Sequence, residues 1–215
     1  MAFTDEQKGI LINNKLSTST VNGQDGNSMK GTYNLANNPQ QYEIQRSNNF
    51  EFYIEGLTNL PTIENNTTAQ EHAEDVIRIS VSKAFIPHFS QGVIEVKRGN
   101  NTMKFAGTPT WQAGNIELND YIGAGTKDVL YAWQRLSYDY NTEKVGLASD
   151  YKKDGYLLEY TPDYQLVRTW KLCGCWISSL SEGEYNHESS EKHTIQAVIE
   201  YDRAYIDTSD IAGNA

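Results

Sequence analysis

Cysteine is scarce: the 215 residues include only two, both in the tripeptide Cys173-Gly174-Cys175. Two cysteines do not make a disulfide framework, and a tetrahedral metal site needs more ligands than these residues supply. Side chains two positions apart in a strand point to the same face, so we expect both thiols to be small buried apolar groups. This cysteine usage is typical of a protein made in the cytoplasm.

Long apolar runs are also missing. No segment approaches the ~18–20 apolar residues that cross a bilayer. Residues 1–20 have no basic segment followed by an apolar one, which a secretory signal peptide requires. We therefore expect neither insertion into a membrane nor secretion through a standard signal.

Positive charge is in deficit. The chain has 18 Lys and Arg against 28 Asp and Glu, a net charge of −10. Affinity for nucleic acid comes largely from basic side chains that meet phosphates, so this balance argues against a surface built to grip DNA or RNA. A surface that stays near DNA without binding it is still compatible with this charge balance. The charges of residues 1–46 cancel, so the whole deficit lies in residues 47–215.

Residues 1–46 differ from the rest in composition as well as charge. The stretch 13–45 is rich in Asn, Gln, Ser, Thr and Gly and shows no hydrophobic period. Such a segment is predicted to be a polar N-terminal arm, flexible or ordered on assembly. The expected organisation is this arm, a β domain over residues 47–207 and a C-terminal tail over residues 208–215.

From Phe50 onward, apolar residues recur with a period of two, which predicts half-buried strands. Gly and Asn in residues 98–101 and the Thr-Pro-Asp-Tyr sequence of residues 161–164 predict turns. The predicted strands are residues 50–54, 77–81, 93–97, 102–105, 116–118, 156–160, 165–175 and 193–201.

One segment has the period of a helix instead. Thr126 is a suitable N-cap, and Asp128 suits the positive end of the helix dipole. A single apolar stripe follows, made of Val129, Leu130, Trp133 and Leu136. The predicted fold class is therefore mainly β, an antiparallel β-sandwich or partly closed barrel with one packed α-helix.

Two glycine-containing segments invite a ligand-binding interpretation and fail its requirements. Residues 123–127 (GAGTK) lack the Gly-Lys pair of a phosphate-binding loop, and Asp128 follows where an anion would bind. Residues 150–155 (DYKKDG) lack the acidic ligands of a calcium loop, with Lys152 at its third position and Thr161 at its twelfth. A turn leading into a helix and a polar turn are the better interpretations.

Catalysis has no positive support. Residues 71–75 (EHAED) and 187–193 (HESSEKH) contain metal-ligating residue types, but they match no zinc signature and are predicted to be solvated acidic surface. No nucleophile elbow is present. We expect no enzyme activity, no catalytic, cofactor-binding or metal residues, and no cofactor.

The four tryptophans leave one binding function open. Trp133 on the helical stripe and Trp170 within a strand are predicted to pack in the core. Trp111 and Trp176 lie near strand ends, where exposed aromatic rings stack on ligands in carbohydrate-binding sandwiches. A β-sandwich carbohydrate-binding module is therefore an alternative hypothesis.

Several stretches, taken in order and spacing, resemble the tail-tube protein of contractile-tailed (T4-like) bacteriophages. The resemblance covers about residues 48–205. Two segments depart from the family's pattern, the polar arm and residues 83–89 (KAFIPHF). The matching stretches are residues 49–54 (NFEFYI), 98–100 (RGN) followed by Gly107 and Trp111, 129–136 (VLYAWQRL), 151–155 (YKKDG), 170–176 (WKLCGCW) and 191–202 (EKHTIQAVIEYD).

The resemblance implies a mechanical role. Members of the family form hexameric rings that stack axially into a hollow tube, and each subunit contributes strands to a ring-shaped β-barrel that lines the channel. The implied partners are further copies of the chain, the tail sheath protein outside, the tape-measure protein and transiently DNA in the lumen, and baseplate and neck proteins at the ends. The implied location is the virion tail, assembled in the bacterial host cytoplasm.

The acidic charge agrees with this role, because a channel that conducts DNA during ejection must repel phosphate weakly. The polar face of the hairpin at residues 93–105 or of the strand at residues 193–201 is a candidate lining. Related alternatives are a tube initiator, a tube terminator, or the tube of a phage-related injection machine.

Overall fold

The computed structural model describes residues 44–57, 60, 72–188 and 190–207. The chain divides into two compact units. Among the described residues, the first unit contains 44–49 and 160–166, and the second contains the remainder. The predicted arm, except for residues 44–46, and the whole predicted C-terminal tail lie outside the described residues, so both stay predictions.

In the first unit, two short segments are joined by hydrogen bonds. The Tyr160 amide donates to the Asn49 carbonyl at 2.9 Å, and the Asn49 side chain donates to the Thr161 carbonyl at 3.0 Å. The Gln165 and Thr161 backbones close the predicted turn, with the Thr161 amide donating to the Gln165 carbonyl at 2.9 Å. Tyr164, the last residue of this turn, has a φ of 61°, which is the left-handed conformation.

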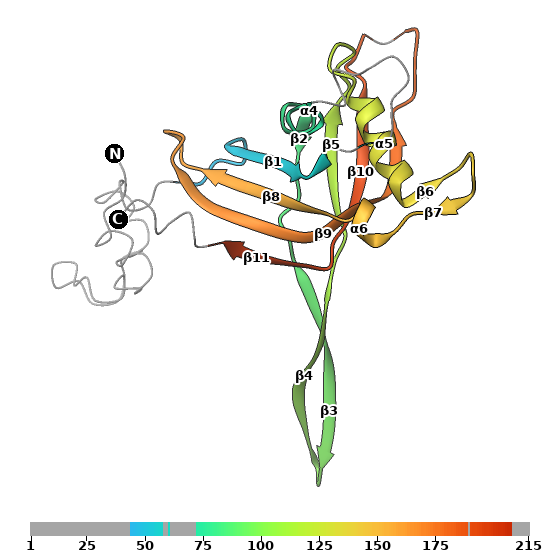
Figure 1. Ribbon diagram of the computed structural model, residues 1–215. Helices are drawn as coiled ribbons and strands as arrows, with labels where there is room; N and C mark the ends of the chain where they lie inside the picture. The colour runs from blue at the N-terminus through green and yellow to red at the C-terminus, as the bar shows by residue number, and fades with distance from the viewer. Residues whose placement is uncertain (1–43, 58–59, 61–71, 189, 208–215) are drawn as a thin grey trace, which may run out of the picture. The chain divides into compact units, whose positions relative to one another are not determined.

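The second unit is built on a seven-stranded antiparallel sheet with the order β1-β8-β9-β10-β5-β2, in which β11 also pairs with β9 (Figure 1). The sheet curls into a half-barrel, which confirms the predicted mainly β class. Its strands are β1 (Phe50–Glu55), β2 (Val81–Lys83), β5 (Gly114–Asn119), β8 (Lys153–Tyr160), β9 (Leu166–Glu182), β10 (Thr194–Glu200) and β11 (Arg203–Asp207).

One face of this sheet carries the hydrophobic core, and the period-two alternation explains why. In β10, Ile195, Ala197 and Ile199 are buried, while Gln196 between them is exposed. Phe52 pairs with Leu157 across β1 and β8, and both are buried. A strand covered on one side must place every second side chain in the core. The predicted strands at residues 50–54, 116–118, 156–160 and 193–201 are thus confirmed.

The segment 77–81, predicted as a strand, is instead the end of helix α4 (Ala73–Ser80) followed by β2. Val76 and Ile77 are buried, whereas Ile79 is 68% exposed. This pattern is helical, because the buried positions 73, 76, 77 and 80 are spaced by three and four residues. The alternation Ile77, Ile79, Val81 was therefore coincidental.

Helix α5 (Thr126–Ser137) confirms the predicted helix and corrects its beginning. Val129, Leu130 and Trp133 are buried, as the stripe predicts. Thr126 is the first helical residue, and Gly125 at the N-cap has a φ of 66° with no side-chain cap. The Thr126 hydroxyl is buried and lies 2.8 Å from that of Ser80 in α4.

The prediction of a single helix was therefore wrong. Helices α4 and α5 both contribute side chains to the core, and a short helix α6 (Ala148–Tyr151) precedes β8. Among the described residues, two helices were missed because each is short: α4 was hidden by a period-two coincidence, and α6 has no buried residue to create a period.

Strand β9 joins the two halves of the sheet. Its residues 169–173 pair with β11, and its residues 176–182 pair with β10. Between these parts, Gly174 has a φ of 72°, which breaks the alternation of side chains. Cys175 is consequently fully buried while Cys173 is partly exposed, so the prediction that both thiols are buried was wrong for Cys173.

Candidate functional site

The segments considered for metal binding do not form a cluster. Among the described residues, no group of three or more His, Cys, Asp and Glu side chains is placed to hold an ion. Glu71 lies outside the described residues, and Glu74 accepts a hydrogen bond from the Gly56 amide at 2.7 Å. Within the described part of the chain, no helix is both long enough and apolar enough to cross a bilayer.

The two glycine-containing segments are structural. Residues 123–125 form the turn before α5, and the Lys127 ammonium pairs with the carboxylate of Glu182. The segment 150–155 was predicted to be a polar turn, which was partly wrong: it contains the end of α6 and the start of β8. Asp154 in β8 makes an ion pair with Lys171 at 3.2 Å.

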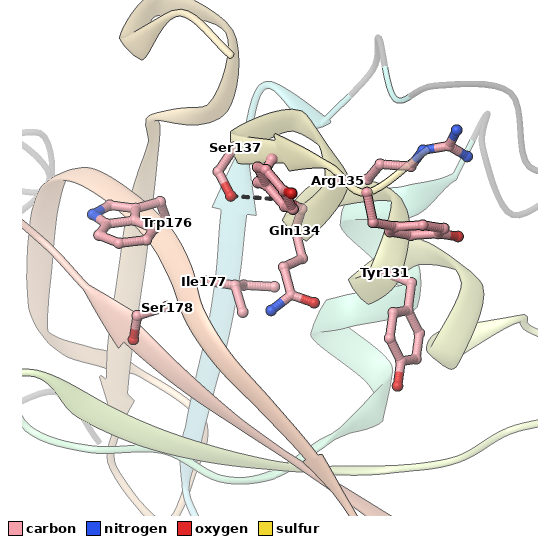
Figure 2. Close-up of a pocket in the computed structure, with 9 residues that line it drawn as sticks. Tyr131, Gln134, Arg135, Ser137, Trp176, Ile177 and Ser178 are labelled. Carbon is pink, nitrogen blue, oxygen red and sulfur yellow. Dashed lines mark hydrogen bonds between the residues drawn. The ribbon is translucent and has the colours of Figure 1, made fainter. Parts of the chain in front are cut away.

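The tryptophans proposed for ligand stacking lie in different surroundings. Trp111 packs against Phe89 and Tyr201, with ring centroids 5.1 and 5.8 Å away. Trp176 contacts Tyr151 edge-on at 5.9 Å and lines a hollow of about 420 Å³ with residues of α5, shown in Figure 2. Trp133 is buried and Trp170 is partly buried against the core, as predicted.

A long exposed feature is the hairpin of β3 (Phe89–Arg98) and β4 (Asn101–Trp111), which was predicted over residues 93–105 and is longer (Figure 1). All of its strand residues are exposed except Gly107 and Trp111, which are partly buried. Figure 1 shows the hairpin pointing away from the sheet of its unit. The hairpin at residues 93–105 therefore packs on no other part of the described chain.

The register divides this hairpin into two unlike faces. Ile94 pairs with Phe105 and Val96 with Met103, which makes one face apolar; these four side chains are 46–55% exposed. Glu95 pairs with Lys104 and Lys97 with Thr102 on the other face. We call the first of these the apolar face. The polar face, proposed above as an acidic lining, carries two lysines and one glutamate.

Aromatic stacking and backbone hydrogen bonds hold the base of the hairpin. Tyr201, which follows β10, lies against Trp111 and stacks on Phe85 at 5.7 Å. The His88 amide donates to the Tyr201 hydroxyl at 3.2 Å, and the Gln112 amide donates to the His88 carbonyl at 3.1 Å. Because an isolated two-stranded hairpin is marginal in water, these contacts fix its direction at the root.

A second exposed surface lies at the other end of β5. It consists of the segments 120–125, 183–188 and 190–193, and we call it the loop end. The Asp120 amide donates to the His193 carbonyl at 3.1 Å, and Tyr185 stacks on the His193 ring at 4.6 Å. Ile122 is 97% exposed and Tyr185 is 77% exposed. The loop end therefore combines a defined backbone with apolar side chains in solvent.

Beside the loop end, an ion pair ties α5 to the end of β9. Lys127 donates to Glu182 at 2.5 Å, and the Tyr131 hydroxyl donates to the same carboxylate at 2.6 Å. The Lys127 ammonium and the Tyr131 hydroxyl hold the pKa of Glu182 below its usual range. A lowered folded-state pKa stabilises the fold above the unfolded pKa, and this contribution is lost as pH falls through the folded pKa.

We expect Glu182→Gln to lower the free energy of unfolding at pH 7 by about 1 kcal/mol or less, because the pair is near the surface. The difference from the natural chain should shrink below the unfolded pKa of 4.5 and vanish below the lowered folded value. Urea unfolding at a series of pH values measures it. Glu188→Gln, at an exposed position, is the control, and a difference independent of pH would contradict the assignment.

Comparison with known proteins adds information on the fold. No protein-family model matches the chain, and no curated protein matches it by sequence. The chain is similar to one in the structure of the PVC sheath/tube terminator of an extracellular contractile injection system. That match has a TM-score of 0.55 and 16% identity and covers 77% of this chain and 97% of the other.

Two further solved structures are similar. A chain of the anti-feeding prophage tube-terminating cap has a TM-score of 0.53 and 18% identity, with 78% and 93% of the two chains covered. A chain of the PVC sheath–tube complex has a TM-score of 0.53 and 18% identity, with 76% and 91% covered. The chain thus has a fold that occurs in assemblies of contractile injection tubes.

Proposed function

We propose that this chain is a non-enzymatic structural subunit of a contractile tail tube. Its copies form hexameric rings that stack axially into a hollow tube inside a sheath, as part of a phage tail or a related injection particle. The sheath, baseplate and neck proteins and the tape-measure protein are its partners. The observation that carries the proposal is a tube-type fold with an exposed amphipathic hairpin that its own chain leaves uncovered.

One end of the sheet supports closure into a ring. In the described part of the chain, β2 pairs only with β5. A strand edge that no further strand covers favours association with another strand, and a closed barrel removes such an edge. A ring in which a neighbouring copy meets β2 satisfies this edge.

The net charge supports a channel that conducts DNA without binding it. The chain carries −10 overall, although the hairpin contributes more basic than acidic residues. The body outside the hairpin is accordingly more acidic than the total suggests. A negative field in a channel repels phosphate and keeps a moving polyanion from adhering.

A tube terminator is the second candidate. It is favoured by the two matches to terminator and cap structures, which cover 97% and 93% of those chains. A terminator differs from a tube subunit in stopping growth, because one of its ring faces does not accept another copy.

Electron microscopy of the purified full chain tests the proposal. A tube subunit should give rings of six-fold symmetry and uniform bore that stack into tubes of variable length. A terminator should give single rings or one fixed stack. A chain that stays monomeric in sedimentation at high concentration would overturn both assignments.

A further inference from the structure

A hollow of about 420 Å³ lies between helix α5, the turn that follows this helix, and strand β9 (Figure 2). Four of the residues that line it are aromatic: Tyr131, Tyr138, Tyr140 and Trp176. Small-molecule sites in proteins are commonly hollows of about 300–1,000 Å³ with mostly apolar and aromatic walls and a few polar groups. This hollow therefore has the size and the lining of a small-molecule site.

The aromatic rings of the hollow are accessible to a ligand. Tyr131, Tyr138 and Tyr140 are 42%, 49% and 66% exposed, and Trp176 is partly exposed. Figure 2 shows Trp176 and Tyr131 on opposite sides of the hollow, with the Gln134 side chain between them. Aromatic rings offer flat apolar faces, and such faces favour a ligand that has an apolar face of its own.

Polar groups stand among these rings. The Ser137 hydroxyl donates to the Gln134 carbonyl at 2.7 Å, and the Ser178 hydroxyl donates to the Val198 carbonyl at 3.3 Å. Each hydroxyl oxygen still has lone pairs that can accept a hydrogen bond, and the Gln134 amide has both donors and an acceptor. The hollow can therefore donate hydrogen bonds to a ligand and accept hydrogen bonds from it.

The charge in the hollow is already compensated. Among the described residues that line it, Arg135 is the only one with a full charge. Its Nε donates to Asp139 at 3.0 Å, and its guanidinium lies 5.3 Å from the centre of the Tyr140 ring. The chain also carries a net charge of −10, which repels anions. An uncharged ligand therefore fits this site better than a charged one.

The turn that forms one wall of the hollow has a fixed shape. Its two short strands, β6 (Tyr138–Asp139) and β7 (Lys144–Val145), pair with each other. The Gly146 amide donates to the Ser137 carbonyl at 3.0 Å, and a methyl group on Gly146 would meet the Leu136 carbonyl oxygen. This close approach holds the turn against the end of α5. A wall that is already formed loses little conformational entropy when a ligand binds.

We propose that this hollow binds an uncharged saccharide. A pyranose ring has a face of C–H groups and a rim of hydroxyls, so its C–H face lies on the Trp176 ring. Its hydroxyls exchange hydrogen bonds with the Gln134 amide and the Ser178 hydroxyl. A nucleotide would bring phosphate to an acidic chain, and an alkyl chain would leave these polar groups without partners. The site goes beyond the proposed tube function and does not depend on it.

Calorimetric titration of the full chain with maltose, cellobiose and N,N′-diacetylchitobiose tests the proposal. We expect at least one of these uncharged disaccharides to bind and to change the tryptophan fluorescence, because Trp176 lies at the site. Tyr140→Ala and Gln134→Ala should each lower the affinity at least tenfold. Tyr185→Ala is the matched control, because it removes a ring that is 77% exposed outside the hollow and should leave the affinity unchanged.

Trp176→Ala should abolish binding, with urea unfolding as the check that this variant still folds. If it does not fold, Trp176→Phe replaces it: the smaller ring should bind more weakly than the indole. Longer oligomers of the same sugars distinguish the source of the ligand. Affinity that rises with oligomer length indicates a polysaccharide strand, and equal affinity indicates a free sugar.

Three results would overturn the proposal. The first is that none of the disaccharides or their oligomers binds. The second is that Tyr140→Ala and Gln134→Ala bind as tightly as the natural chain. The third is that N-acetyl-tyrosinamide, a mimic of a protein side chain, binds in the hollow where the sugars do not, which would assign the hollow to a protein partner. Because binding is measured apart from assembly, failure of the tube function would leave this proposal standing.

Discussion

Replacing Trp133 with alanine should lower the free energy of unfolding by about 3–5 kcal/mol, the usual cost of a large cavity in a core. The Trp133 side chain is 1% exposed and is among the largest fully buried groups. Its indole N–H donates to the Tyr151 carbonyl at 3.0 Å, which ties α5 to α6. The substitution removes both the packing and the donor. Because domains are commonly stable by only about 5–15 kcal/mol, this change threatens the whole fold.

Urea unfolding measures this loss of stability. Two further variants serve as comparisons. Trp133→Phe retains most of the apolar volume but not the hydrogen bond. Its free energy of unfolding should therefore lie between those of the natural chain and of Trp133→Ala. Tyr140→Ala removes a ring that is 66% exposed, so it should lower the free energy of unfolding only slightly. If Trp133→Ala costs no more than Tyr140→Ala, the assignment of Trp133 to the core is wrong.

Gly174→Ala should lower the free energy of unfolding by about 1–3 kcal/mol for two reasons. Gly174 has a φ of 72°, which costs an L-residue about 1–2 kcal/mol. An added methyl group would also meet the carboxylate of Asp202, which pairs with Lys152 at 2.7 Å. The position lies where β9 passes from one half of the sheet to the other, so strain here affects both halves.

Two other glycines separate these causes. Gly99 has a φ of 62° with open space around it, and Gly123 has open space and no positive φ. Gly99→Ala should therefore show the backbone cost alone, and Gly123→Ala should show neither cost. Equal midpoints for Gly174→Ala and Gly123→Ala in thermal unfolding would refute the argument.

The sequence predicted correctly those elements that bury one side, because their apolar residues recur with the period of the strand or helix. Ile195, Ala197 and Ile199 alternate because β10 has one covered face, and Val129, Leu130 and Trp133 lie on one stripe of α5. It failed at α4, where Ile77, Ile79 and Val81 happen to alternate in a segment that is helical. A helix of eight residues holds too few turns to distinguish the two periods.

The exposure of the hairpin was less accessible from the sequence. The hairpin at residues 93–105 was predicted, and its alternation suggested a strand with one buried face. Yet Ile94, Val96 and Phe105 are exposed in the structure. An alternating apolar pattern is the same whether the side chains are buried in the core of their own chain or exposed at its surface. The mixed charge of the hairpin and the acidic loop end were visible as composition, but not as a pair of surfaces.

The sequence by itself determined the mainly β class, the main helix and the acidic balance, because each depends on local period or on a count. The tertiary structure alone decided that β9 is one strand shared by two halves of a sheet, since its break depends on the conformation of Gly174. It also decided that the basic hairpin and the acidic loop end lie at opposite ends of β5. The positions of these surfaces relative to each other depend on strand pairing between residues that are distant in the sequence, which no local pattern encodes.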